Sequence, residues 1–241
     1  MPQISATSRE ERKKLLISRE VLIPPHGLAG TLNRPGGARA LVIFAHGSGS
    51  SRFSSRNIRV AEALNRRGIA TLLLDLLLPQ EEEDRQNVFD ISLLAQRLKQ
   101  AVRWVIEEPD VNSLPIGLFG ASTGAAAALV AVSGLGDRIG AVVSRGGRPD
   151  LAGDRLPLVK IPTLLIVGGA DYGVIELNQQ ALERLGGEKS IQIVPDATHL
   201  FEEAGALDAV IELAAGWFES HLVAGSLRPT KADPRKPDAR Q

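Results

Sequence analysis

Residues 118–130, LFGASTGAAAALV, contain a Gly-x-Ser-x-Gly motif centred on Ser122. In this pattern the serine sits on a sharp turn between a strand and a helix, where its hydroxyl can act as a nucleophile. An apolar run leads into the turn and an alanine-rich run leads out of it, as that geometry requires. Gly120 and Gly124 would keep side chains out of a crowded turn. The alternative is that Ser122 only caps the helix that follows.

A serine hydroxyl is a poor nucleophile until a base takes its proton, so a histidine is required. The sequence contains four histidines, and His199, in VPDATHLFEE, follows the last apolar run. This position places His199 at the expected carboxyl edge of a sheet, within reach of Ser122. The alternative role for His199 is a loop or cap residue before the final helix.

The histidine in turn needs a carboxylate that fixes its tautomer and stabilises the imidazolium. Asp171, in LLIVGGADYGV, comes just past another apolar run, whereas Asp75 precedes the serine and is followed by more leucines. A cap of the helix beginning near residue 174 is the alternative role for Asp171. Along the chain the order is Ser122, Asp171, His199. This is the order nucleophile, acid, base that proteins with a nucleophilic serine on such a turn have.

The fourth candidate element is the glycine-rich stretch FAHGSGSSRFSSRN at 44–57. Its glycines let backbone amides face a developing negative charge. We expect the amide of Ser48, with that of Gly47 as second choice, to form an oxyanion hole with the amide of Thr123, and Gly47 to contact the substrate. Phosphate binding is the alternative, but the stretch lacks the Gly-x-x-x-x-Gly-Lys-[Ser/Thr] pattern.

Short apolar runs alternate with longer amphipathic segments along the chain. The runs predict strands at 14–24, 27–35, 40–47, 69–76, 115–121, 139–147, 162–169 and 190–196, and the other segments predict helices at 55–67, 88–107, 123–134, 174–186 and 206–222. This alternation indicates right-handed βαβ units, and hence an α/β fold with a doubly wound, mostly parallel sheet of about eight strands flanked by helices. The connection between the sixth and seventh runs is too short for a large cap domain.

Four pieces in order, HGSGSSRFSSRN, GASTG, GGADYGV and ATHLFEE, resemble the α/β-hydrolase superfamily, and in particular its small, capless dienelactone-hydrolase-like branch. The resemblance covers 15–222 and implies Ser122 as nucleophile, Asp171 as acid and His199 as base. Dienelactone hydrolases carry a cysteine nucleophile, whereas this chain has no cysteine. The resemblance therefore implies a serine hydrolase that cleaves an ester, thioester or lactone through an acyl-enzyme. Similar domains also occur joined to phosphoribosyltransferase domains, and we do not expect such a domain within these 241 residues.

Two other functions use the same features. An acyltransferase would use the same three residues with a different acceptor, and a non-catalytic binding protein would keep only the fold.

Several arginines follow the expected strands near this site. Arg145 and Arg148, in SRGGRPD, are candidates for binding an anionic substrate group such as a carboxylate. The alternative is that they pair with aspartates of their own loop. Arg52 and Arg56 allow the same two interpretations. The acidic stretch at 79–87 is expected to be a solvated loop.

Composition narrows the class of protein. A chain of 241 residues that is 44% hydrophobic predicts one soluble domain at 15–222, with tails at 1–14 and 223–241. Because 28 basic residues balance 28 acidic ones, we expect no nucleic-acid or membrane partner. We expect a small-molecule acyl substrate, no cofactor and, since no cluster has metal-ligand spacing, no metal. The start of the chain lacks a secretory signal, so a cytoplasmic protein is expected, and a homodimer is left open.

Overall fold

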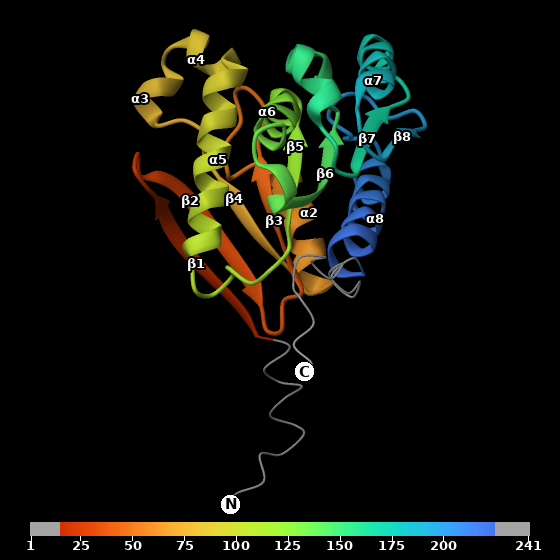
Figure 1. The fold of residues 1–241 in the computed structure, drawn as a ribbon. Helices are drawn as coiled ribbons and strands as arrows, with labels where there is room; N and C mark the ends of the chain where they lie inside the picture. The colour runs from red at the N-terminus through yellow and green to blue at the C-terminus, as the bar shows by residue number, and fades with distance from the viewer. Residues whose placement is uncertain (1–14, 225–241) are drawn as a thin grey trace, which may run out of the picture.

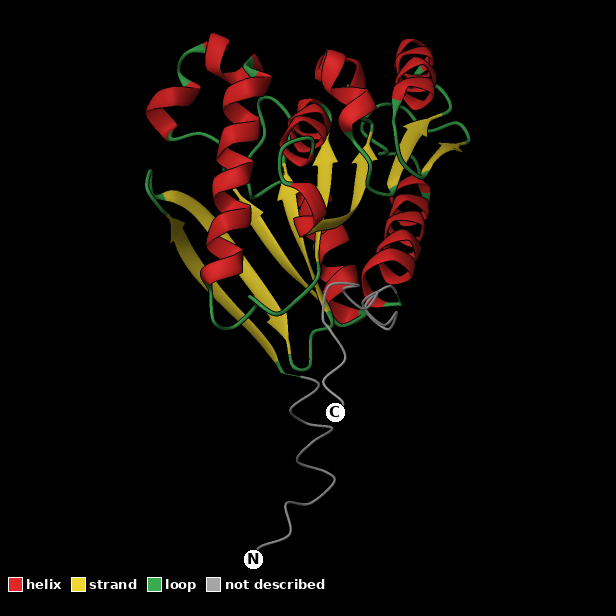
Figure 2. Cartoon of the chain, viewed as in Figure 1, coloured by secondary structure: helices red, strands yellow, loops and turns green. Residues whose placement is uncertain are grey.

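The computed structural model describes residues 15–224, so the predicted tails lie outside the described residues except for 223 and 224. A single sheet of eight strands runs in the order β1-β2-β4-β3-β5-β6-β7-β8 (Figures 1 and 2). The strands are β1 (Leu16–Ile23), β2 (Leu28–Pro35), β3 (Ala40–Ala45), β4 (Ile69–Leu74), β5 (Ile116–Ala121), β6 (Ile139–Arg145), β7 (Thr163–Gly168) and β8 (Lys189–Val194). β1 and β2 are antiparallel, and β3 to β8 are parallel to one another. The predicted α/β fold is confirmed.

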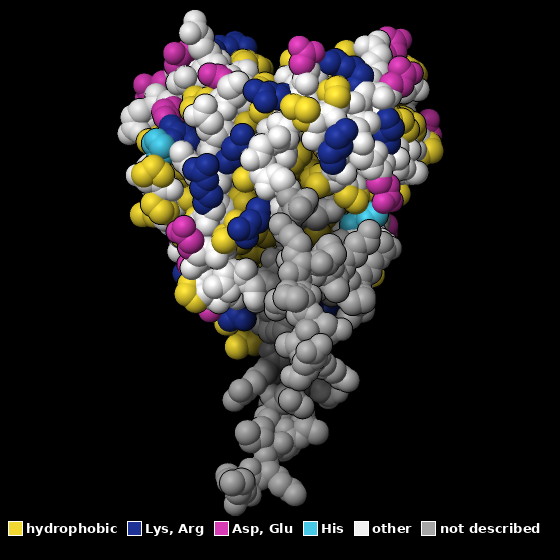
Figure 3. Space-filling view, in the orientation of Figure 1, with side chains coloured by type: hydrophobic (Ala, Val, Ile, Leu, Met, Phe, Trp, Pro, Cys, Tyr) yellow, Lys and Arg dark blue, Asp and Glu magenta, His cyan; other side chains and the backbone are white. Residues whose placement is uncertain are grey.

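Helices cover both faces of the sheet. One apolar layer joins the sheet to α5 (Ile91–Glu107), α6 (Thr123–Val132) and α7 (Tyr172–Arg184), and the other joins it to α2 (Ser55–Arg66) and α8 (Ala206–Phe218). Every residue of β3, β4, β5 and β7 is buried, which explains why these strands are continuous apolar runs rather than alternating ones. Basic, acidic and hydrophobic side chains are interspersed on the face shown in Figure 3.

The segment between β4 and α5 differs from the sequence-based expectation. The stretch 79–87 is largely exposed, as expected, but it is not a loop, because it contains two short helices, α3 (Pro79–Glu82) and α4 (Arg85–Phe89). Glu81 accepts a hydrogen bond from the Leu78 amide at 2.9 Å and pairs with Arg97, which is buried. The ion pair between Glu81 and Arg97 therefore holds this segment against α5. The predicted helix at 88–107 is also divided, because Asp90 accepts a bond from the Leu93 amide at 2.9 Å and caps α5.

Short 3-10 turns (Gly136–Arg138 and Pro149–Leu158) and a terminal π-helical turn (Glu219–Val223) complete the described chain. The connection from β6 to β7 is one of these turns, and the expectation of no large cap domain is confirmed. Among the helices within residues 15–224, none has the length and apolarity that a membrane span requires.

The turn between β5 and α6 packs tightly against the end of β3. A Cβ at Gly124 would lie 2.3 Å from the Ala45 carbonyl oxygen and 2.4 Å from that of His46. A Cβ at Gly120 would lie 2.4 Å from the Cα of Ala125. These neighbours are backbone atoms, which cannot move aside as a flexible side chain would. Glycine is therefore required at both positions, as the motif predicts.

Replacing Gly124 with alanine is expected to lower the free energy of unfolding by about 2–4 kcal/mol, because the new methyl group would overlap two backbone carbonyls. Urea denaturation followed by circular dichroism measures the change. The matched control is Gly216→Ala in α8, where a Cβ meets nothing within 4 Å. That variant should gain about 0.5–1 kcal/mol from helix propensity. Equal stability of Gly124→Ala and the wild type would contradict the tight packing of this turn.

Candidate active site

Ser122 has an unusual backbone conformation at the tip of the turn between β5 and α6. Its φ is 50° and its ψ is −121°, a combination rare for residues other than glycine. Ser122 occupies the cap position of α6, yet its side chain makes no capping hydrogen bond. Helix capping therefore does not occupy the hydroxyl, which distinguishes Ser122 from Ser54, whose hydroxyl accepts a bond from the Asn57 amide at the start of α2.

Asp171 and His199 are hydrogen-bonded to each other. Asp171 follows β7 and stands at the cap position of α7, but its side chain makes no capping bond. Its Oδ2 instead lies 2.7 Å from Nδ1 of His199, in the loop after β8. When Nδ1 carries the proton and donates a hydrogen bond to the carboxylate, Nε2 is left as an acceptor, which is the tautomer that a general base needs.

Ser122 and His199 line the same cavity at the carboxyl ends of the parallel strands. This cavity has a volume of about 260 Å³, and its lining also includes Gly47, Ser48 and Arg145. The carboxyl ends of β5 to β8 point towards the top of Figure 1, where the loops after these strands gather. The structure thus brings Ser122 and the Asp171–His199 pair to one edge of the sheet.

The glycine-rich loop lies directly against the serine. A Cβ at Gly47 would lie 2.9 Å from the Cβ of Ser122. The Ser48 amide donates to the hydroxyl oxygen of Thr123 at 2.9 Å, so in this structure it is bonded to a side chain. Thr123 is the first residue of α6, and its own amide has no acceptor within the helix. The contact made by the Thr123 hydroxyl is not visible in the sequence, because 75 residues separate the two partners.

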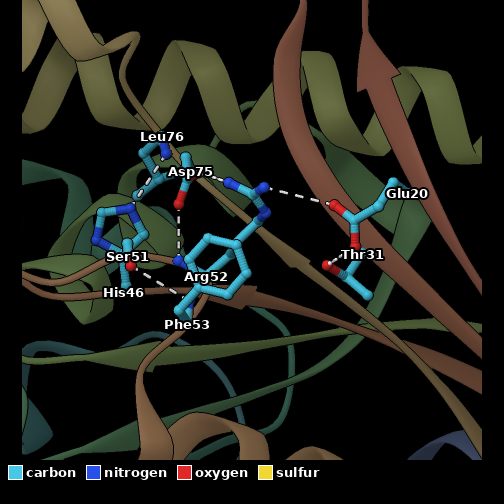
Figure 4. Close-up of polar contacts among 8 residues, drawn as sticks. All are labelled: Glu20, Thr31, His46, Ser51, Arg52, Phe53, Asp75 and Leu76. Atoms are coloured by element: carbon cyan, nitrogen blue, oxygen red, sulfur yellow. Dashed lines mark hydrogen bonds and ion pairs between the residues drawn. The ribbon is translucent and has the colours of Figure 1, made fainter.

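Arg52 holds the glycine-rich loop to the end of β4 (Figure 4). Its amide donates to Oδ1 of Asp75 at 2.7 Å, and its guanidinium pairs with the same carboxylate and, at 3.4 Å, with Glu20. His46, at the start of the loop, accepts a hydrogen bond on Nε2 from the Leu76 amide at 3.2 Å. Of the two roles open to Arg52, the structure favours the structural one, and His46 has a positioning role that its sequence context does not reveal.

Arg145 and Arg148 occupy different environments although they are three residues apart. Arg148 forms two hydrogen bonds to Asp150, at 2.9 and 2.8 Å, and this pairing raises its pKa. Arg145 is only 6% exposed and lines the cavity beside Ser122. Burial, together with the nearby charge of Arg56, lowers the pKa of Arg145 to about 10, so the guanidinium remains charged at neutral pH.

A second and larger cavity lies on the other side of the glycine-rich loop. Its volume is about 760 Å³, and it shares Gly47 and Ser48 with the first cavity. The remaining wall mixes apolar side chains, among them Leu77 and Phe89, with the charged side chains of Glu82 and Arg85. Ser122 is among the residues that line the smaller cavity and is not among those that line the larger one. Within residues 15–224, no group of three or more His, Asp or Glu side chains is arranged to hold a metal ion.

Comparisons with known proteins identify the family and agree with the fold. Residues 28–216 match the model of the dienelactone hydrolase family. A crystal structure of dienelactone hydrolase from Anabaena variabilis has 52% sequence identity and a TM-score of 0.83, over 87% of this chain and 99% of that one. Est1E from Butyrivibrio proteoclasticus shares the fold with a TM-score of 0.71 at 16% identity, over 84% of this chain and 98% of its own.

A Mycobacterium tuberculosis protein provisionally named phosphoribosyl transferase is 57% identical over 84% of this chain, but the match covers 46% of that protein. This chain therefore spans about half the length of the curated relatives it matches.

Proposed function

The chain belongs to the dienelactone hydrolase family, and on that premise we propose that it hydrolyses an ester, thioester or lactone with Ser122 as nucleophile, His199 as general base and Asp171 as the acid that orients the base. Family membership and the fold support hydrolase chemistry. What we propose beyond hydrolase chemistry is that serine is the nucleophile, that the three residues have the roles named above, and that the substrate is an ester, thioester or lactone.

In the first half of the reaction, Nε2 of His199 takes the proton of the Ser122 hydroxyl while Oγ bonds to the acyl carbon. The bond from that carbon to the leaving oxygen or sulfur then breaks, and the leaving group takes the proton from His199. In the second half, water attacks the acyl-enzyme and passes a proton to His199. The acyl bond to Oγ breaks, the carboxylic acid is released, and the proton returns to Ser122. Asp171 stabilises the imidazolium in both halves.

The negative oxygen of each tetrahedral intermediate needs hydrogen-bond donors. The amide of Thr123 begins α6 and has no acceptor within the helix, so it supplies one donor. The Ser48 amide supplies a second by exchanging the Thr123 hydroxyl for the oxyanion, with the Gly47 amide as the alternative. This exchange replaces a neutral hydrogen bond with a stronger charge-assisted one. Until then the Thr123 hydroxyl keeps the Ser48 amide next to the reaction site.

One observation carries the proposal. Asp171 and Ser122 stand at the cap positions of their helices, and neither side chain caps its helix. The carboxylate of Asp171 is bonded to His199, which lines one cavity with Ser122. If these residues had only a structural role, both side chains would be expected to cap their helices by hydrogen bonding.

Reaction with a fluorophosphonate tests the proposal, since such reagents label activated serine hydroxyls. We expect a single adduct, located on Ser122 by peptide mass spectrometry, and a matching loss of ester hydrolysis measured by pH-stat titration. Ser133, at the far end of α6, is the internal control, because its hydroxyl donates to the Val130 carbonyl at 2.8 Å and should stay unlabelled. Full ester hydrolysis by the labelled protein, or labelling of another serine alone, would refute the proposal.

A further inference from the structure

We propose that Asn178, on α7, is a positioning residue that keeps the strained turn at Ser122 in its reactive shape by holding the loop after β6. The inference rests on the proposed ester hydrolysis and adds to it a side chain that lines neither of the two cavities. It begins from a buried amide group that none of the proposed catalytic roles uses.

Asn178 is fully buried in α7, where Ala181 is the other buried residue. Its Nδ2 donates to the Gly147 carbonyl at 3.0 Å and to the Val174 carbonyl, one turn earlier in the helix, at 2.8 Å. Its Oδ1 is inaccessible to solvent and has no hydrogen-bond partner within residues 15–224. An unpaired buried amide oxygen lowers the free energy of unfolding, so stability alone does not explain an asparagine here. Its distinctive contact is the bond to Gly147, which links α7 to the loop after β6.

The Gly147 carbonyl belongs to the same planar peptide group as the Arg148 amide. That amide donates to the Ser122 carbonyl at 3.1 Å, and the Ser122 amide donates to the Arg145 carbonyl at 3.3 Å. The backbone of Ser122 is therefore held on both sides by the end of β6 and the loop after it. Because the C=O and N–H of one trans peptide point in opposite directions, Asn178 fixes the direction in which the Arg148 N–H points. The two hydrogen bonds act in series, and each polarises the other.

The serine turn depends on such support because its backbone is strained. The φ of Ser122 is 50°, and a residue other than glycine keeps such a conformation only when its surroundings hold it there. The same loop also lies against the base, since a Cβ at Gly146 would lie 2.9 Å from the His199 carbonyl oxygen. The 3-10 turn that continues the loop packs against both α6 and α7 (Figure 1). Through the side chain of Asn178, the helix that follows Asp171 thus holds the turn that presents Ser122.

Asn178→Thr tests this role. Threonine has a helix propensity close to that of asparagine, and its hydroxyl can bond to the Val174 carbonyl as the amide does, but it leaves the Gly147 carbonyl unbonded. We expect kcat for ethyl butyrate, measured by pH-stat titration, to fall about 10- to 100-fold while KM stays within about threefold. The reason is that a displaced nucleophile slows the attack without removing contacts to the substrate. The rate of reaction with a fluorophosphonate should fall in the same range, because Ser122 attacks that reagent too.

Asn65→Thr is the matched control, because it removes a similar buried amide on the opposite face of the sheet. Asn65, on α2, donates from Nδ2 to the Ile69 carbonyl at 2.9 Å and lines neither cavity beside the glycine-rich loop. Both substitutions leave a carbonyl unpaired, so both should lower Tm by about 2–10 °C. Only Asn178→Thr should lower kcat. A wild-type kcat in Asn178→Thr, a loss confined to KM, or an equal loss of kcat in Asn65→Thr would overturn the positioning role.

Amide hydrogen exchange, followed by NMR, measures the same link without turnover. The Ser122 and Arg148 amides should exchange about 10-fold faster or more in Asn178→Thr, and as in the wild type in Asn65→Thr. Asn178→Ser, which lacks the branched methyl group, provides the same comparison if the threonine variant does not fold. If the wild type hydrolyses no ester and does not react with the fluorophosphonate, the proposed function fails. Exchange then decides alone whether Asn178 holds the turn, and unchanged exchange at both amides would overturn the inference.

Discussion

Replacing Ser122 with alanine is expected to lower kcat/KM for a neutral ester by about 10⁴- to 10⁶-fold, because the covalent route through the acyl-enzyme is lost. The remaining hydrolysis would come from direct attack by water, aided by the oxyanion donors and by binding of the substrate. A pH-stat assay with purified enzyme at high concentration can measure so small a rate. The backbone strain at Ser122, with φ at 50°, remains in the alanine variant, so folding should change little.

Ser133→Ala is the matched control for this prediction. Ser133 follows the same helix at its other end, and its hydroxyl donates to a backbone carbonyl rather than lining the cavity. Its removal should leave kcat/KM within about twofold, in line with the small effects of substitutions away from a site. If Ser122→Ala retained a tenth of the wild-type rate, Ser122 would not be the nucleophile.

Asp171→Asn is expected to lower kcat by about 10³- to 10⁴-fold while the protein stays folded. The asparagine amide would donate to Nδ1 of His199, where the carboxylate oxygen now accepts at 2.7 Å. That reversal forces the proton onto Nε2, so the imidazole can no longer take the proton of Ser122. The measurement is kcat by pH-stat titration, with circular dichroism to confirm the fold.

The control for this substitution is Asp150→Asn. Asp150 is a carboxylate that pairs with Arg148 in the loop after β6 and makes no contact with His199. Its replacement should change kcat by no more than a few-fold. Equal values of kcat for Asp171→Asn and the wild type would mean that Asp171 does not orient the base.

Much of this architecture follows from patterns local in the sequence. A strand buried on both faces is a short apolar run, and β3 to β7 satisfy that description closely. In a parallel sheet the residues after each strand meet at one edge. The placement of Ser122, Asp171 and His199 at that edge could therefore be anticipated, although their roles remain predictions.

Other features depend on contacts between distant parts of the chain. The charged stretch 79–87 is largely exposed, as its composition predicts, but the sequence does not show that Glu81 pairs with Arg97, 16 residues later. Arg145 ends β6 and Arg148 lies three residues later, and the sequence offers both arginines the same aspartate partners. Only the structure shows that Arg148 pairs with Asp150, whereas Arg145 lines a cavity, donates to Asn57 and lies over the ring of Phe201.

The order of the strands has a consequence for how substrate preference can diverge among related proteins. Ser122 follows β5, with β3 and β4 on one side of it and β6, β7 and β8 on the other. The larger cavity is lined by the segments that follow β3 and β4, on the first side, and the arginine of the small cavity comes from β6, on the second. Substitutions in α4 and at Arg145 would change different cavities, although Gly47 and Ser48 line both. Under the proposed function, the two cavities are therefore two distinct places at which substitutions can change substrate preference.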